Sequence, residues 1–66
     1  MEVYVKMRDK SSTVELDEDS TISCLLERLE INRETVLVMV NQEIRVEEEM
    51  LKQGDEVEII MAVSGG

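Results

Sequence analysis

The spacing of apolar residues changes three times along the chain, and these changes limit the folds that are open to it. Residues 2–8 and 13–17 alternate apolar and polar side chains, a period of two that is typical of half-buried strands. Helical spacing occurs once, at Ile22, Leu25, Leu26 and Leu29. Residues 36–40 are apolar without interruption, and residues 57–63 alternate again. The predicted order, strand–strand–helix–strand–strand–strand, favours an α+β fold in which one helix covers one face of a single sheet.

Polar residues between these segments give the expected boundaries. Asp19 or Ser20 can cap a helix over residues 21–30, and Asn32 follows as a stop. Residues 9–12 predict the turn between the first two strands. Further elements are expected as a turn at 41–42, an edge strand at 43–46, a loop or single helical turn at 47–51 that buries Met50 or Leu51, and a turn at 53–55.

Length and composition narrow the class of function. A chain of 66 residues is one domain with a small core, and it leaves little room for a deep active-site pocket. The sequence has no histidine, the commonest general base and metal ligand, and no glycine loop for phosphate. We therefore expect a protein that is not itself an enzyme and that binds no metal or cofactor of its own.

The charge balance favours a protein partner. Sixteen acidic residues against seven basic ones give a net charge of −9. Nucleic acid phosphates would be repelled, so direct binding to nucleic acid is not expected, whereas a partner with a basic face is favoured. No apolar run reaches the length of a membrane span, and no signal peptide is visible. With one cysteine and therefore no intramolecular disulfide, the chain is expected to be cytoplasmic.

The single cysteine and the acidic runs have simple expected roles. Cys24 stands beside the helical apolar stripe without a second cysteine or a histidine to activate it, so we expect it to pack as a small residue. A nucleophile or persulfide site is the alternative. Residues 17–19 and 47–49 lack the ligand spacing of a calcium loop and are expected to be solvated.

Gly65 and Gly66 end the chain directly after the predicted last strand. Glycine has no Cβ, so two glycines in succession can lie in a narrow channel that larger side chains would block. An activating enzyme could bring the Gly66 carboxylate to ATP through such a channel. The segment has no apolar anchor, so a flexible tail of residues 64–66 is expected beyond a domain of residues 1–63.

Three segments in the second half of the chain carry a family resemblance. Residues 40–44 read Val-Asn-Gln-Glu-Ile, residues 54–60 read Gly-Asp-Glu-Val-Glu-Ile-Ile, and residues 62–66 read Ala-Val-Ser-Gly-Gly. In this order they resemble the ThiS/MoaD family of ubiquitin-like sulfur carriers, and the first half agrees in element order and length. The resemblance implies a β-grasp (ubiquitin-like) roll in which the first and last strands pair in parallel at the centre of one mixed sheet.

The resemblance also implies an activity that depends on other proteins. An E1-like enzyme would use ATP to adenylate Gly66, and the C-terminus would become a thiocarboxylate. The sulfur would pass to an acceptor synthase or thiotransferase for thiamine, molybdopterin or tRNA thiolation. Members of the family also form isopeptide bonds with protein lysines, so Lys6, Lys10 and Lys52 are candidate acceptors for a copy of the same tail.

The sheet face opposite the helix is the predicted docking surface. It is expected to expose five apolar residues: Tyr4, Leu37, Met39, Ile60 and Ala62. Monomers rarely leave large apolar patches uncovered, so such a patch favours docking of a partner. The alternative function is a non-catalytic β-grasp interaction module that uses this face and has an incidental Gly-Gly end.

Overall fold

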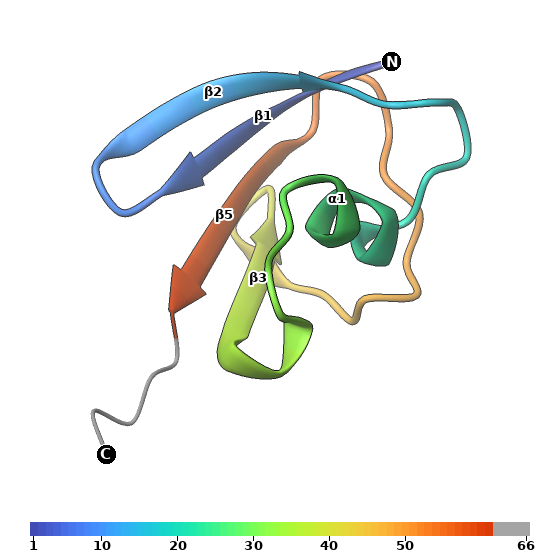
Figure 1. Cartoon of the computed structure of the whole chain (residues 1–66). Coiled ribbons are helices and arrows are strands. Elements are labelled where there is room, and N and C mark those ends of the chain that lie inside the picture. The colour runs from blue at the N-terminus through green and yellow to red at the C-terminus, as the bar shows by residue number, and fades with distance from the viewer. Residues whose placement is uncertain (62–66) are drawn as a thin grey trace.

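The first and last strands lie side by side at the middle of a five-stranded sheet (Figure 1). The computed structural model describes residues 1–61. Its strands are β1 (Glu2–Met7), β2 (Lys10–Glu15), β3 (Val36–Val40), β4 (Glu43–Ile44) and β5 (Glu56–Met61). They stand in the order β2-β1-β5-β3-β4, and β1 and β5 are parallel while the other neighbours are antiparallel. This arrangement confirms the predicted mixed sheet and its parallel centre.

One helix, α1 (Ile22–Arg28), packs across one face of the sheet, and a single 3₁₀ turn, η1 (Arg33–Thr35), leads into β3 (Figure 1). The buried core lies between α1 and the sheet: Val3, Val5, Leu16, Ile22, Leu25, Leu26, Val38, Val40, Leu51, Val57 and Ile59. The period-two pattern of β1 and β5 and the helical stripe are therefore confirmed, although Leu29 is only partly buried. The fold is an α+β β-grasp roll.

The strand boundaries differ from the predicted ones in polar segments, where the sequence predicts turns. Residues 9–12 are not a turn, because Met7 pairs with Lys10 and the reversal is made by Arg8 and Asp9 alone. Arg8 adopts a left-handed φ of 59° to close it. The polar residues that follow belong to β2, an edge strand whose side chains are mostly exposed. A polar edge strand and a polar turn have the same composition, so composition could not separate them.

The helix is shorter than predicted, and different residues cap it. Thr21, not Asp19 or Ser20, is the N-cap, and its hydroxyl accepts a hydrogen bond from the Cys24 amide at 3.3 Å. The Ser20 hydroxyl instead donates to the Asp17 carbonyl at 2.6 Å. At the other end the Ile31 amide donates to the Leu26 carbonyl at 2.9 Å.

That last hydrogen bond is half of a Schellman motif, which stops the helix before Asn32. Glu30 takes the left-handed position with a φ of 59°, and its amide donates to the Glu27 carbonyl at 3.0 Å. Asn32 then caps η1 instead of α1, since its side chain accepts from the Glu34 amide. Glycine is the usual residue at such a position, so Glu30 gave no sequence signal for a helix end.

The second half of the chain follows the predicted turns closely. Residues 41–42 form the two-residue β3–β4 turn with left-handed φ values of 52° and 71°, and Gly54 has a φ of 83°. The predicted edge strand is shorter, because β4 ends at Ile44. The sequence predicts that the following loop buries either Met50 or Leu51, and Leu51 is the buried one while Met50 is exposed.

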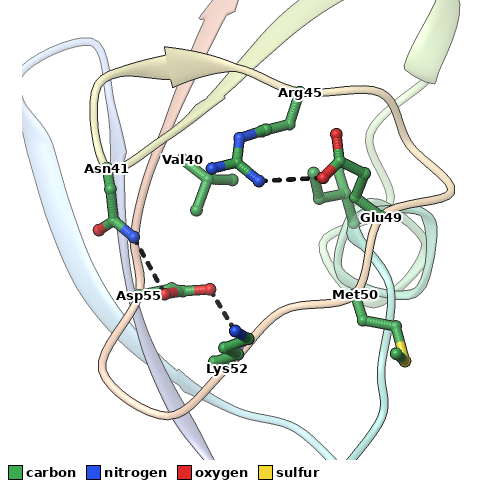
Figure 2. Close-up of a pocket in the computed structure, with 8 residues that line it drawn as sticks. Val40, Asn41, Arg45, Glu49, Met50, Lys52 and Asp55 are labelled. Atoms are coloured by element: carbon green, nitrogen blue, oxygen red, sulfur yellow. Dashed lines mark hydrogen bonds and ion pairs between the residues drawn. The ribbon is translucent and has the colours of Figure 1, made fainter.

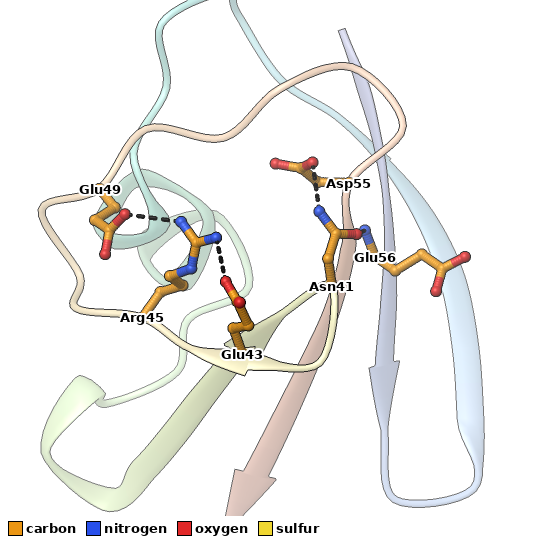
Figure 3. A network of polar contacts seen from close by, with 6 residues as sticks. All are labelled: Asn41, Glu43, Arg45, Glu49, Asp55 and Glu56. Atoms are coloured by element: carbon orange, nitrogen blue, oxygen red, sulfur yellow. Dashed lines mark hydrogen bonds and ion pairs between the residues drawn. The ribbon is translucent and has the colours of Figure 1, made fainter.

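A polar buckle joins the β3–β4 turn to the start of β5 (Figure 3). The Asn41 side chain donates to the Asp55 carboxylate at 3.1 Å and accepts from the Glu56 amide at 3.1 Å. The other Asp55 oxygen accepts from the Lys52 amide at 2.8 Å. The Asp55 carbonyl in turn accepts from the Tyr4 amide at 2.9 Å, which joins the buckle to β1. The buckle therefore holds the residue at which β5 begins.

Truncation of the helix stripe tests the packing of α1. Leu26 is 3% exposed. Leu26→Ala should cost about 2–5 kcal/mol, a large share of the roughly 5–15 kcal/mol that stabilises a domain of this kind. Urea unfolding followed by circular dichroism measures the change. A variant that unfolds at the same urea concentration as the parent would show that this side chain does not fill the core.

Two substitutions of Asn41 test the buckle. Asn41→Gly keeps a residue suited to the left-handed φ but removes both side-chain hydrogen bonds, which should cost about 1–3 kcal/mol. Asn41→Ala should cost more, because alanine also disfavours this φ. Equilibrium unfolding of both variants gives the order. If Asn41→Ala is as stable as the parent, the buckle does not stabilise the sheet.

Candidate functional site

The end of β5 determines where the C-terminal segment leaves the sheet. Since β5 runs parallel to β1, with Met7 opposite Ile59, Met61 lies at the end of the sheet where β1 also ends. The chain continues into residues 62–66 from this end of the sheet. Ala62, Gly65 and Gly66 lie outside the described residues, as does the expected boundary between the domain of residues 1–63 and the flexible tail of residues 64–66. Their roles stay predictions.

The open face, which is the sheet face opposite α1, carries a small apolar cluster (Leu37, Met39, Ile44 and Ile60). Leu37 pairs with Ile60 across β3 and β5, and Met39 pairs with Ile44 across β3 and β4. Residues directly opposite in an antiparallel pair share a face and lie close together. Leu37 is 47% exposed, Ile44 68% and Ile60 39%. The cluster therefore offers accessible apolar surface near the end of the sheet from which residues 62–66 depart.

Tyr4 shares the open face but not the cluster. It lies opposite Glu56 on β5, and the next pair along these strands is Lys6 with Glu58. Glu58 in turn faces Met39 across β3, so a charged row separates Tyr4 from Ile60. Tyr4, Lys6, Glu56 and Glu58 line a hollow of about 280 Å³. Within residues 1–61, the predicted docking residues thus form two regions, one apolar and one mixed with charge.

The three candidate acceptor lysines are spread over the fold. Lys6 lies on the open face in β1, Lys10 begins β2, and Lys52 lies in the loop before β5. All three side chains are exposed. Exposure is necessary for conjugation but is common among lysines, so their role stays a prediction.

Cys24 does not pack into the core, so the expectation of a small buried residue is wrong. It is exposed on α1, because the helix directs Leu25 and Leu26 inward and turns the residue before them to solvent. The Thr21 hydroxyl donates to its sulfur at 3.4 Å. This hydrogen bond lowers the pKa of the Cys24 thiol, and the Glu27 carboxylate partly opposes the shift.

A hollow of about 100 Å³ lies between the β3–β4 turn and residues 49–55 (Figure 2). In its lining Arg45 contacts Glu49 at 2.9 Å, and it also contacts Glu43, outside the lining, at 2.7 Å. The hydrogen bond to Glu43 contributes most to raising the pKa of the Arg45 guanidinium above its usual range, and the bond to Glu49 adds to this effect. The Arg45 and Glu49 side chains in this hollow are therefore already engaged with each other.

Neither a cluster of metal-binding side chains nor a membrane-length helix occurs in residues 1–61. In residues 1–61, no three or more side chains of His, Cys, Asp or Glu gather closely enough to hold a metal ion. The same residues contain no helix of the length and hydropathy that a membrane span requires.

Ile44 is the member of the apolar cluster that sequence reasoning missed. The sequence predicts an edge strand at residues 43–46, but the composition of this strand does not indicate which side chains lie opposite β3. The signal was present in the turn length, because a two-residue turn at Asn41 and Gln42 places Met39 opposite Ile44. The register of the hairpin therefore assigns Ile44 to the open face.

Comparison with known proteins gives a family and a fold. The ThiS family model matches residues 1–66. A structure of SAMP1 from Haloferax volcanii superposes with a TM-score of 0.80 at 21% identity and covers 100% of both chains. A structure of small archaeal modifier protein 1 from the same organism gives 0.79 at 19% identity, with 94% of this chain and 98% of that chain covered. A search of curated proteins found no match.

These findings agree with the β-grasp architecture and with the family resemblance of the sequence. At such low identity the two solved structures support the fold alone, whereas the family model extends over every residue of the chain. The chain belongs to the ThiS family.

Proposed function

We propose that this chain is a ubiquitin-like carrier whose Gly66 carboxylate is activated by an E1-like enzyme. One observation carries the proposal: the ThiS family match runs through residues 65–66, the Gly-Gly pair that follows β5 by only a few residues. A small domain with its reacting group on a terminal segment needs a second protein for catalysis. The enzyme would supply the ATP site, and this chain would supply the carboxylate.

The proposed chemistry has two steps. A carboxylate oxygen of Gly66 attacks the α-phosphorus of ATP, and pyrophosphate leaves with the electron pair of the broken P–O bond. The product is an acyl-adenylate, in which AMP is the leaving group. Hydrosulfide then attacks the carbonyl carbon and expels AMP to give the thiocarboxylate. A lysine amine attacking the same carbon would give an isopeptide bond.

Both fates of the activated carbonyl belong to the proposal. Sulfur transfer to a synthase or thiotransferase, for a sulfur-bearing cofactor or a thiolated tRNA base, follows from the family resemblance. Conjugation to protein lysines is included because one solved structure of the same fold is of a protein named as a modifier. The two fates differ only in which nucleophile reaches the acyl-adenylate.

The apolar cluster of the open face is proposed as the docking surface for the activating enzyme. Leu37 and Ile60 are adjacent and exposed, and they lie near the end of β5 from which the reacting segment departs. An apolar contact here would hold the domain while the terminal residues extend into the active site. The net charge of −9 favours an enzyme surface with basic residues around an apolar centre.

Deletion of Gly66 should abolish adenylation while leaving docking intact. One extended residue spans about 3.3–3.6 Å, so the shortened chain would hold its carboxylate outside the roughly 3–3.5 Å needed for attack. ATP–pyrophosphate exchange, measured against increasing concentrations of the E1-like enzyme, should stay at background at every concentration. Exchange by the deletion variant at the parental rate would overturn the assignment of Gly66.

Ile60→Asp should have the opposite effect. The substitution places a charge beside Leu37 in the apolar cluster, so affinity for the enzyme should fall by about tenfold or more while the carboxylate keeps its chemistry. Saturating enzyme should therefore restore pyrophosphate exchange. Met50→Asp is the matched control, because Met50 is 61% exposed but lies outside the open face.

If Ile60→Asp and Met50→Asp bind the enzyme as tightly as the parent, the open face is not the docking surface. If the parent itself gives no exchange with the E1-like enzyme of its source organism, a plain interaction module is the better description.

A further inference from the structure

The sheet has an unpaired backbone edge beside an apolar groove. β4 is only two residues long and pairs only with Met39 and Val40. The last backbone hydrogen bond on this side runs from the Arg45 amide to the Val38 carbonyl at 3.1 Å. Beyond it the chain turns toward α1, where the Ser23 amide donates to the Glu47 carbonyl at 2.9 Å. The first residues of β3 are left without a neighbouring strand on that side.

The ladder geometry identifies the residue that presents its backbone there. In an antiparallel strand, residues two apart direct their N–H and C=O groups to the same side. The Val38 carbonyl points to β4, so both backbone groups of Val36 point to the same open edge. Within residues 1–61, neither group pairs with a neighbouring strand, and Val36 is half-buried. This edge can accept the backbone of an added strand.

The groove beside this edge has an apolar floor. It has a volume of about 270 Å³ and lies between α1, β3 and residues 44–48. Its apolar lining is Ile22, Leu26, Val36, Leu37, Val38, Ile44 and Val46. Val46 is 60% exposed at its rim. Arg33 and Glu47 form an ion pair of 2.8 Å at its rim, and because both side chains are partly exposed the pair is weak enough to open.

The alternation of side chains along β3 indicates which residues an added strand would need. A residue opposite Val36 would point into the groove, and a residue opposite Leu37 would point to the open face beside the apolar cluster. Both environments are apolar. The occupant therefore needs consecutive aliphatic residues, and β-branched ones suit an extended segment best.

The charges around this edge indicate which residues should flank the aliphatic residues of the occupant. Four glutamates (Glu43, Glu47, Glu48 and Glu49) surround this edge with two arginines (Arg33 and Arg45), which leaves two formal negative charges. Both arginines are already bonded to glutamates: Arg33 to Glu47, and Arg45 to Glu43 and Glu49, of which the Arg45 contacts are drawn in Figure 3. Lysine or arginine on the occupant would be attracted, whereas a second copy of this chain, with its own charge of −9, would be repelled.

We propose that the β3 edge and its groove bind an extended aliphatic segment with basic flanks from a protein partner, which adds to the sheet as a strand next to β3. The groove shares Leu37 and Ile44 with the apolar cluster, but the Val36 backbone and Val46 lie outside that cluster, and binding here does not require the activation of Gly66. It would allow one partner to hold the domain from the sheet edge.

The probe is a blocked octapeptide with two lysines, four alternating valines and isoleucines, and two further lysines. Binding should shift the amide NMR signals of residues 36–38 and slow hydrogen exchange at the Val36 amide, because that group gains a hydrogen bond. Peptides with glutamates in place of the lysines, or with a central proline, should bind at least about tenfold more weakly. Added salt should weaken binding of the lysine peptide.

Val46→Asp should weaken the peptide by about tenfold or more, because the carboxylate would lose water in the groove, while Met50→Asp should not change binding. Amide spectra of both variants verify the fold, and pyrophosphate exchange at Gly66 should be unaffected in both. Equal affinity for Val46→Asp, or protection of the β2 edge in place of Val36, would overturn the proposal. Protection of Val36 by self-association of the protein alone would also overturn it, since the occupant would then be a second copy.

Discussion

The parallel pairing of β1 and β5 is the constraint on which the rest of the fold depends. Parallel neighbours cannot be joined by a tight turn, so the intervening chain must cross from one end of the sheet to the other. α1 lies in that crossing and covers the inner side chains of both strands, with Val3 and Leu25 fully buried. Because the pair is parallel, Met61 lies at the end of the sheet opposite to the end at which β1 starts. The segment proposed to react therefore departs from a firmly held central strand.

Tight reversals make this crossing compact, and most of them use residues other than glycine. Arg8, Asp19, Glu30, Asn41 and Gln42 all have left-handed φ values, and Gly54 is the only described glycine. Such a conformation costs L-residues roughly 1–2 kcal/mol each. Local hydrogen bonds offset part of that cost at two of these positions, through the Schellman motif at Glu30 and the buckle at Asn41. The sheet register thus depends on a few exposed polar contacts as well as on the small core.

The sequence predicted elements where burial was periodic and missed boundaries where conformation depended on single residues. Val57 and Ile59, or Leu25 and Leu26, show their burial through spacing, because the spacing reflects one face of a strand or helix. The end of α1 depends on Glu30, whose left-handed backbone has no signature in its residue type. The open face was predicted in part, since Leu37, Met39 and Ile60 gather there, but the charged row before Tyr4 required the β1–β5 register. The roles of Ala62, Gly65 and Gly66 rest on sequence and family alone.

The central claim is that the C-terminal carboxylate, and no side chain of the domain, carries the chemistry. The direct measurement is the intact mass of the protein after incubation with its E1-like enzyme, ATP and sulfide, with fragmentation to locate any change. The account predicts a gain equal to the replacement of one oxygen by sulfur, located at Gly66 and dependent on ATP. A parent protein whose mass stays unchanged with an active enzyme, or a sulfur adduct located at Cys24 instead, would contradict it.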